Sequence, residues 1–271
     1  MNTPTTRYLD REDGRISYDD TGGDGPLVVA APGMGDLRQV YRHLRDDLVE
    51  AGLRFVTMDL RGMGETSTDW AHLDDAAVAS DYLALVDHLG GGPAVLIGNS
   101  LSCAASVLAA TDAPDKVSGM VLLGPFVRDV PMAWWAKAAF GAMLLPPWGR
   151  HVWVSYYGSK LYPGTPPPDL DAYLDRLRAN LSEPGRYATF RSISTTSHAE
   201  SGRRLADVNQ PVVVVMGTAD PDFPDPAAEA HGIAEILGAS VVLAEGAGHY
   251  PQAETPGIVV GAITELVGSL A

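Results

Sequence analysis

The sequence predicts an α/β fold: a mostly parallel central sheet flanked by helices, with a helical cap inserted after the sixth strand. Short apolar runs rich in β-branched residues alternate with amphipathic stretches, which is typical of a sheet covered by helices. The apolar runs are nearly continuous, as strands buried on both faces require. Between residues 125 and 206 this alternation stops, which indicates an insertion of a different kind.

The expected elements follow in chain order. Two short runs, around Tyr8 and at residues 16–18, predict an antiparallel pair at one edge of the sheet. Further apolar runs predict buried strands, and the amphipathic stretches between them predict helices. The remaining strands are expected at 27–31, 54–60, 94–98, 117–123, 212–217 and 240–244, and the helices at 37–51, 74–89, 100–110, 226–237 and 256–267.

The insertion divides the chain into two parts. Residues 1–124 and 207–271 are expected to form the core domain, and residues 125–206 the helical cap. The cap holds four of the five tryptophans, together with prolines and short helical stretches. A chain of 271 residues is long enough for one large domain with such an inserted lobe.

Composition excludes several classes of function. The net charge of −15 repels phosphate backbones and anionic membrane surfaces, so no nucleic-acid or membrane partner is expected. The apolar runs are far shorter than the roughly 18 residues of a membrane helix. Because residues 1–13 lack the apolar stretch of a secretory signal, a cytoplasmic location is expected. Cys103 is the single cysteine and is expected in the core. The oligomeric state stays open.

Ser100 is the candidate nucleophile. The predicted strand 94–98 runs directly into the sequence Gly-Asn-Ser-Leu-Ser at residues 98–102, and a helix of small residues follows. A nucleophile on a sharp strand-to-helix turn needs small neighbours, because the strained turn packs against adjacent backbone. The helix N-terminus behind Ser100 adds backbone donors near a developing negative charge. The alternative is that Ser100 only caps the helix.

Two further residues complete a possible triad. Asp220 follows the predicted strand 212–217, and His249 lies on a glycine-rich loop after the last strand. Ligands of open α/β sheets bind at the carboxyl ends of the strands, where both residues are expected. Serine, aspartate and histidine in this chain order match one known arrangement of a catalytic triad. Asp129 also follows a strand and is the alternative acid.

The chain resembles the α/β-hydrolase fold family over nearly its whole length. Four segments carry the resemblance: PGMG at 32–35, DLRGMG at 59–64, GNSLS at 98–102 and GHYP at 248–251. The resemblance implies an α/β-hydrolase fold, and the break in alternation predicts that the helical insertion lies over the end of its sheet. The resemblance also implies the catalytic roles of serine, aspartate and histidine described above.

The same resemblance implies where an oxyanion is held. In the family, the residue after the first glycine and the residue after the nucleophile donate backbone N–H groups, and here these are Met34 and Leu101. Two positions differ from the family pattern. Pro32 stands where the family usually has a histidine that can brace the oxyanion loop, and Ser102 replaces the usual glycine.

These features predict a serine hydrolase of the esterase or lactonase type. His249 would take the proton of Ser100, Ser100 would attack a carbonyl carbon, and water would release the acyl group. No cofactor is expected, and the other histidines show no metal-ligand spacing. A thioesterase, a C–C bond hydrolase, a cofactor-free perhydrolase and a receptor-like binding protein with little turnover remain alternatives on the same frame.

The expected substrate is a small apolar or aromatic molecule. Aromatic side chains of the cap are expected to wall an apolar pocket above Ser100. The cap has ten Lys or Arg and six Asp or Glu, so its net charge is +4 and an anionic substrate is possible. The alternative is that these charges lie on solvated helix faces. The residues expected to line the pocket are Phe126, Trp134, Trp135, Trp148 and Trp153.

Overall fold

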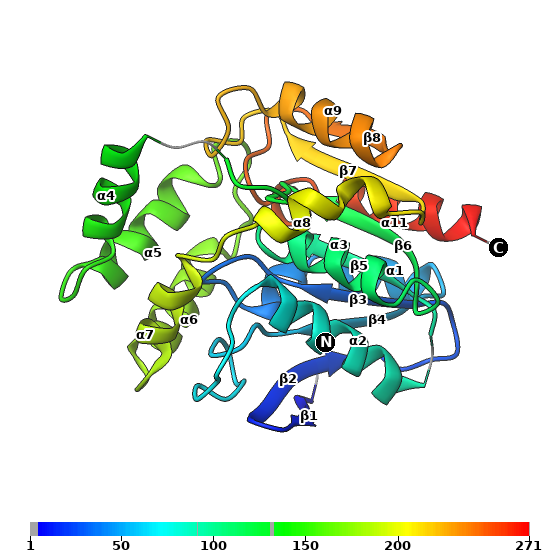
Figure 1. Cartoon of the computed structure of the whole chain (residues 1–271), viewed down its shortest axis with the longest axis horizontal. Helices are drawn as coiled ribbons and strands as arrows, with labels where there is room; N and C mark the ends of the chain where they lie inside the picture. The colour runs from blue at the N-terminus through cyan, green and yellow to red at the C-terminus, as the bar shows by residue number, and fades with distance from the viewer. Residues whose placement is uncertain (1–4, 91, 131–132, 271) are drawn as a thin grey trace.

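A computed structural model describes residues 5–90, 92–130 and 133–270. In this part of the chain, one eight-stranded sheet has the strand order β1-β2-β4-β3-β5-β6-β7-β8 (Figure 1). β1 pairs antiparallel with β2, and β2 pairs antiparallel with β4, while the other pairs are parallel. The strands are β1 (Arg7–Arg11), β2 (Gly14–Asp20), β3 (Leu27–Ala31), β4 (Arg54–Met58), β5 (Ala94–Asn99), β6 (Val117–Leu123), β7 (Val212–Gly217) and β8 (Ser240–Ala244).

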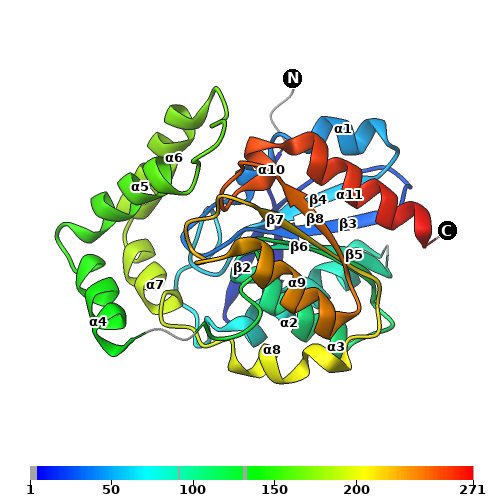
Figure 2. The same ribbon diagram turned by 90° about the horizontal axis from the view of Figure 1, so that it is seen from above.

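Helices cover both faces of the sheet. α1 and α11 lie on one face, and α2, α3 and α8 lie on the other (Figure 2). Every residue of β3, β5 and β7 is buried, which explains why these strands are apolar throughout. The core helices are η1 (Arg38–Tyr41), α1 (Arg45–Glu50), α2 (Asp75–Leu89), α3 (Ser102–Asp112), α9 (Pro226–Leu237), α10 (Pro251–Glu254) and α11 (Pro256–Ser269).

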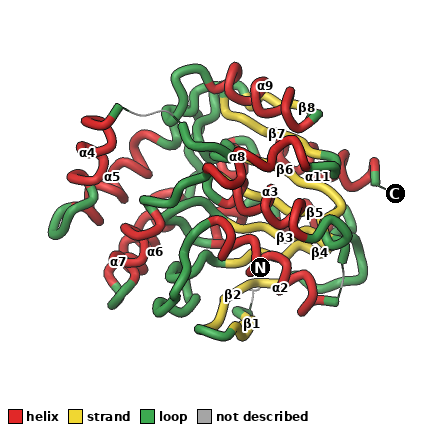
Figure 3. The backbone as a smooth tube through the Cα atoms, in the orientation of Figure 1, coloured by secondary structure: helices red, strands yellow, loops and turns green. Residues whose placement is uncertain are grey.

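The insertion after β6 is helical, as the sequence predicts. The described part of the segment between β6 and β7 contains helices and loops but no strand (Figure 3). The last of them, α8, packs against α3 of the core, so the chain has rejoined the core before β7 begins. The domain boundaries at residues 125 and 206 stay a prediction. The helices are α4 (Trp134–Met143), α5 (Gly149–Lys160), α6 (Leu170–Ser182), α7 (Arg186–Ile193) and α8 (Ala199–Arg204), followed by η2 (Leu205–Asp207).

One predicted helix is divided. The sequence predicts a single helix over 37–51, whereas the structure has the short helix η1 and then α1. The cause is Arg38, whose backbone N–H donates to Asp59 Oδ1 at 2.7 Å and whose buried guanidinium pairs with Asp19 and Asp59. These contacts fix the beginning of the segment against the core, and a regular helix begins only seven residues later. Among the described residues, no helix combines the length and the hydropathy that crossing a membrane requires.

Candidate active site

Ser100 sits on the sharp turn between β5 and α3. Its φ is 57°, in the left-handed region that residues with a side chain rarely adopt. The neighbouring glycines make this turn possible. A Cβ on Gly98 would lie 2.6 Å from the backbone N of Cys103, and one on Gly33 would lie 3.0 Å from Cβ of Ser100. The chain therefore holds Ser100 in a strained conformation that larger neighbours would not permit.

Ser102 has a structural function in this turn. Its hydroxyl donates to the carbonyl oxygen of Ala31 at 2.7 Å and accepts from the backbone N–H of Asn99 at 2.8 Å. It thereby links the end of β3 to the end of β5. A glycine at this position could make neither bond, so the departure from the family pattern strengthens the turn instead of only being tolerated.

His249 and Asp220 form a buried pair. Nδ1 of His249 lies 2.7 Å from Oδ2 of Asp220, and the two side chains are 3% and 0% exposed. Asp220 follows β7, and His249 lies on the loop after β8. The side-chain amide of Asn99 donates to the carbonyl oxygen of His249 at 3.2 Å. Since Asn99 precedes Ser100, this bond joins the serine turn to the histidine loop.

A second carboxylate faces the same imidazole. Oδ2 of Asp222 lies 3.6 Å from Nδ1 of His249, and Oδ1 of Asp222 accepts from the hydroxyl of Tyr156 at 2.6 Å. Burial alone lowers the pKa of His249, but the charges of Asp220 and Asp222 outweigh it and raise the pKa to about 9. Sequence reasoning would assign Asp222 to a solvated loop, because only its spacing of two residues from Asp220 points to the site.

Asp129, the alternative acid, contacts other groups than His249. Its carboxylate accepts from Ser197 Oγ at 2.8 Å and from the backbone N–H of His198 at 2.7 Å. These contacts place it at the beginning of α8, where it stabilises the helix N-terminus. Of the two candidate acids, only Asp220 contacts the imidazole.

Among the described residues, the side chains of Asp220, Asp222 and His249 come closest to the arrangement of a cation site. Ligand atoms of Asp220, Asp222 and His249 all lie within 4.8 Å of one another. However, Nδ1 of His249 and Oδ2 of Asp220 are 2.7 Å apart. Two ligands about 2.0 Å from one tetrahedral ion would be about 3.3 Å apart. The pair therefore has the geometry of a hydrogen bond and not of two metal ligands.

Met34 and Leu101 lie on the two chain segments that flank Ser100. Leu101 follows it directly, and Met34 follows Gly33, which contacts Ser100. In the described part of the chain, neither backbone N–H of these two residues donates a hydrogen bond to another backbone group. A backbone N–H without a backbone acceptor is able to bind a negatively charged oxygen.

The five aromatic residues expected around the pocket separate into two groups. The ring of Phe126 lies 5.9 Å from that of His249, and Trp153 is buried against Phe190 with a ring separation of 5.0 Å. The other three point to solvent. Trp134 and Trp135 lie on α4, which buries none of its residues and lies at the outer end of the cap, and Trp148 directly precedes α5 (Figure 1). Trp134, Trp135 and Trp148 are 82%, 63% and 51% exposed, so the prediction that they wall a pocket is wrong for this structure.

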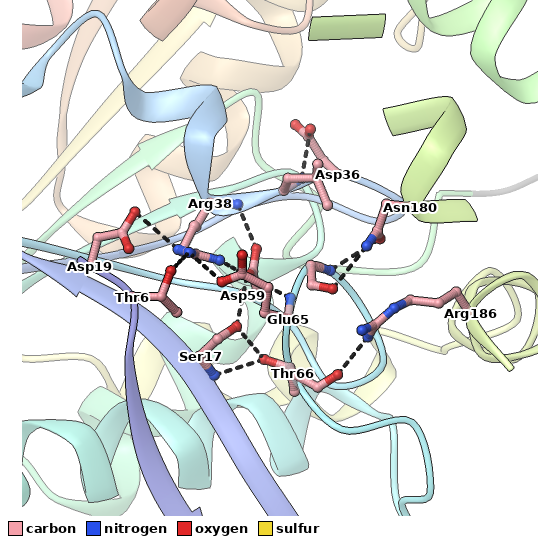
Figure 4. Close-up of polar contacts among 12 residues, drawn as sticks. Thr6, Ser17, Asp19, Asp36, Arg38, Asp59, Glu65, Thr66, Asn180 and Arg186 are labelled. Atoms are coloured by element: carbon pink, nitrogen blue, oxygen red, sulfur yellow. Dashed lines mark hydrogen bonds and ion pairs between the residues drawn. The ribbon is translucent and has the colours of Figure 1, made fainter. Parts of the chain in front are cut away.

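A cavity of about 660 Å³ lies elsewhere, between η1, β2, β4 and α6. Its lining includes Arg38 and Asn180, but neither Ser100 nor His249. Several polar groups beside this cavity already have partners (Figure 4). Arg38 pairs with Asp19 and Glu65, and the side chain of Asn180 exchanges two hydrogen bonds with the backbone of Gly64, at 3.1 and 2.8 Å. This network attaches the cap to the core.

The comparisons with known proteins agree with this fold. Residues 28–262 match the model of the alpha/beta hydrolase family. The chain is 28% identical over 259 residues to a 2-(acetamidomethylene)succinate hydrolase of Mesorhizobium japonicum, a match that covers 90% of this chain and 89% of that protein. A probable esterase of Oryza sativa subsp. japonica is 32% identical, but the chain spans only 40% of its length. A thermophilic esterase from Thermogutta terrifontis has the same fold, with a TM-score of 0.80, 22% identity, and coverage of 98% of this chain and 99% of that one.

The first prediction concerns the second carboxylate. Asp222→Asn removes a negative charge 3.6 Å from the imidazole, so we expect the pKa of His249 to fall by roughly one unit. An NMR titration of the imidazole measures this shift. Asp171→Asn on the exposed face of α6 is the control and should leave the titration unchanged. An unchanged pKa in Asp222→Asn would mean that solvent screens this carboxylate from the histidine.

Proposed function

The chain belongs to the alpha/beta hydrolase family, and from this premise we propose that it is a serine hydrolase that cleaves a carboxylic ester or lactone of a mainly apolar small molecule. The observation that carries the proposal is the buried Asp220–His249 pair beside the strained turn of Ser100. Ser100, Asp220 and His249 follow three different strands, β5, β7 and β8, and the carboxyl ends of parallel strands lie at one edge of a sheet.

The proposed reaction has two halves. His249 accepts the proton of the Ser100 hydroxyl as the oxygen attacks the carbonyl carbon, and the N–H groups of Met34 and Leu101 stabilise the negative oxygen. The intermediate collapses to an acyl-enzyme, and the imidazolium protonates the departing alkoxide. A water molecule, deprotonated by His249, then attacks the acyl carbon and releases the acid and Ser100. Every proton is taken up and returned by His249.

The two carboxylates would have different tasks. Asp220 receives the Nδ1–H bond, so it selects the tautomer in which Nε2 can accept a proton. Asp222 is half-buried and stands farther from the ring, where its charge stabilises the imidazolium without fixing its orientation. Because the pKa of His249 is raised to about 9, the imidazole is mostly protonated at neutral pH, and the neutral form that accepts the Ser100 proton becomes more populated as the pH rises toward 9.

The apolar part of the substrate would contact Phe126 and Trp153. Phe126 packs against Phe223 with a ring separation of 4.8 Å and donates its backbone N–H to the carbonyl oxygen of Ser100 at 3.3 Å. Trp153 reaches the segment beside the nucleophile through Gly35. Aromatic walls beside a few convergent polar groups are typical of sites for small apolar ligands.

The second prediction tests the nucleophile. A fluorophosphonate should label the protein at one site, and Ser100→Ala should abolish the labelling and lower kcat by several orders of magnitude. Intact-protein mass spectrometry measures the stoichiometry. Ser192→Ala changes an exposed serine on α7 and should keep full labelling. Full labelling of the Ser100→Ala variant would overturn the mechanism.

The third prediction concerns the bond that is cleaved. We expect kcat/KM for an ester or lactone to exceed that for a matched thioester or β-diketone by at least roughly tenfold, and to increase with the apolar bulk of the substrate. A panel of substrates with the same acyl group measures this preference. Preferential cleavage of the diketone would instead make the protein a C–C bond hydrolase, and a preference for acetyl esters would contradict the apolar pocket.

A further inference from the structure

The loop at residues 32–35 needs a support that its own sequence does not supply. It carries Met34, the proposed oxyanion donor, but Pro32 stands where a bracing histidine is usual in the family. A backbone N–H stabilises an oxyanion only when it is held at the correct position in advance. The residues that follow Met34 are therefore the place to look for contacts that hold this loop.

Asp36 makes such contacts, and it makes them with the cap. It is fully buried, and its Oδ1 accepts from the backbone N–H of Leu37 at 2.8 Å and from the hydroxyl of Tyr173. Its Oδ2 accepts from the hydroxyl of Tyr157 at 2.9 Å. Tyr157 belongs to α5 and Tyr173 to α6, so one core carboxylate binds two cap helices.

Gly35 is held by the cap as well. Its carbonyl oxygen accepts from Nε1 of Trp153 at 3.3 Å. Its φ is +66°, and a Cβ at this position would lie 2.5 Å from the ring of Phe190 and 2.9 Å from Trp153. Gly35 and Asp36, the two residues that follow Met34, thus contact side chains of α5, α6 and α7 as well as the core.

We propose that Asp36 is a positioning residue: through Tyr157 and Tyr173 it fixes the oxyanion loop to the cap and thereby aims the N–H of Met34 at the carbonyl bound to Ser100. This inference rests on the proposed hydrolase function. Under this proposal the cap has a second task besides covering the substrate. Its contacts with Asp36 hold the loop that carries Met34 and so complete the oxyanion hole.

The charges around Asp36 suit this task. The Arg42 guanidinium lies 4.4 Å from the centre of the Tyr173 ring, and the Tyr162 hydroxyl lies 3.1 Å from that of Tyr157. On the site side, Tyr250 and His249 face the same cluster. Burial raises the pKa of Asp36 to about 6, so the carboxylate is ionised at neutral pH and can accept from both tyrosines.

The fourth prediction tests this role with a substitution of the same size. In Asp36→Asn the amide nitrogen cannot accept a hydrogen bond, so one tyrosine loses its acceptor. We expect kcat to fall at least roughly tenfold with KM within about twofold, since part of one oxyanion contact is lost. The affinity for a boronic acid, whose tetrahedral adduct needs the oxyanion hole, should fall by a similar factor, while the affinity for the product acid should not change.

Tyrosine variants separate positioning from stability. Tyr157→Phe and Tyr173→Phe should each reproduce part of the loss of kcat. In Asp36→Asn the amide oxygen still accepts from Leu37 and Tyr173, so Asp36→Asn with Tyr157→Phe should lose no more than Asp36→Asn alone. Tyr187→Phe is the control, because its hydroxyl donates within the cap, to Leu144 at 2.8 Å. A raised KM with unchanged kcat, or fully additive losses, would overturn the role of Asp36. Absence of fluorophosphonate labelling in the unmodified protein would instead overturn the proposed function.

A second inference comes from the outer surface of the cap. Trp134, Trp135, Leu145 and Trp148 are exposed apolar residues of α4 and the segment after it, and together they are here called the tryptophan patch. Leu145 is 41% exposed, and α4 buries no residue. Apolar side chains gathered in this way on a protein surface usually mark a binding face.

The segment that carries the tryptophan patch has a charge of the opposite sign to the rest of the chain. Residues 130–168 contain three Lys or Arg and no Asp or Glu. The chain as a whole has 19 basic and 34 acidic residues, so the remainder has 16 and 34, a net charge of −18 beside +3 here. The basic residues are Lys137, Arg150 and Lys160.

We infer that the tryptophan patch docks on an anionic lipid surface. Tryptophan favours the interface between water and lipid, and nearby lysine and arginine are attracted to anionic headgroups. A symmetric contact between two copies would place two positive patches together and is disfavoured. The expectation of no membrane partner came from the net charge alone, which conceals this local surplus of positive charge.

The fifth prediction is measured by co-sedimentation with vesicles. We expect binding to phosphatidylglycerol vesicles with a blue shift of tryptophan fluorescence, weaker binding to phosphatidylcholine, and loss of binding at high salt. Trp134→Ala with Trp135→Ala and Trp148→Ala should abolish it, whereas Ile236→Ala with Ile258→Ala, exposed apolar residues of α9 and α11, should not.

Three results would overturn the lipid inference. One is equal binding to both vesicle types, and another is unchanged binding by the triple tryptophan variant. The third is concentration-dependent self-association in light scattering that this variant loses, which would make a second copy of the chain the occupant.

Discussion

The structure depends on one strained residue. Ser100 has a positive φ because only two residues join the end of β5 to the beginning of α3. The contacts of the candidate site surround this tight turn. Gly98 and Gly33 leave room for it, while Ser102 and Asn99 tie it to β3 and to the histidine loop. Such a strained conformation persists only where several independent contacts hold it, and here both packing and hydrogen bonds do so.

The second constraint is charge in a buried site. His249 is enclosed, yet two carboxylates keep its protonated form favourable, and the fully buried Asp36 stands among tyrosines that donate to it. Each buried charge therefore has hydrogen-bond partners, as burial requires. Tyr157 and Tyr173 belong to the insertion, so the cap supplies the hydrogen bonds of a buried core carboxylate that lies two residues after Met34.

Most of the fold could be predicted because its signals are local. The apolar runs, the small residues around Ser100 and the residues after each strand are visible in short windows of sequence, and the serine, histidine and aspartate lie where these windows place them. The rest depends on contacts between distant segments. Asp222 and Asp36 show nothing unusual in sequence, and their importance comes from His249 and from the tyrosines of α5 and α6. The prediction that Trp134, Trp135 and Trp148 wall a pocket is wrong for the same reason, since an aromatic composition does not say which way a cap helix faces.

The central claim is that Ser100 attacks a carbonyl whose oxygen is held by Met34 and Leu101. A crystal structure of the protein after inactivation with a phosphonate ester tests it most directly. The account predicts phosphorus bonded to Oγ of Ser100, with the phosphonyl oxygen about 3 Å from both backbone nitrogens and the Asp220–His249 pair intact. An adduct on a different residue, or a phosphonyl oxygen held by other groups, would contradict it.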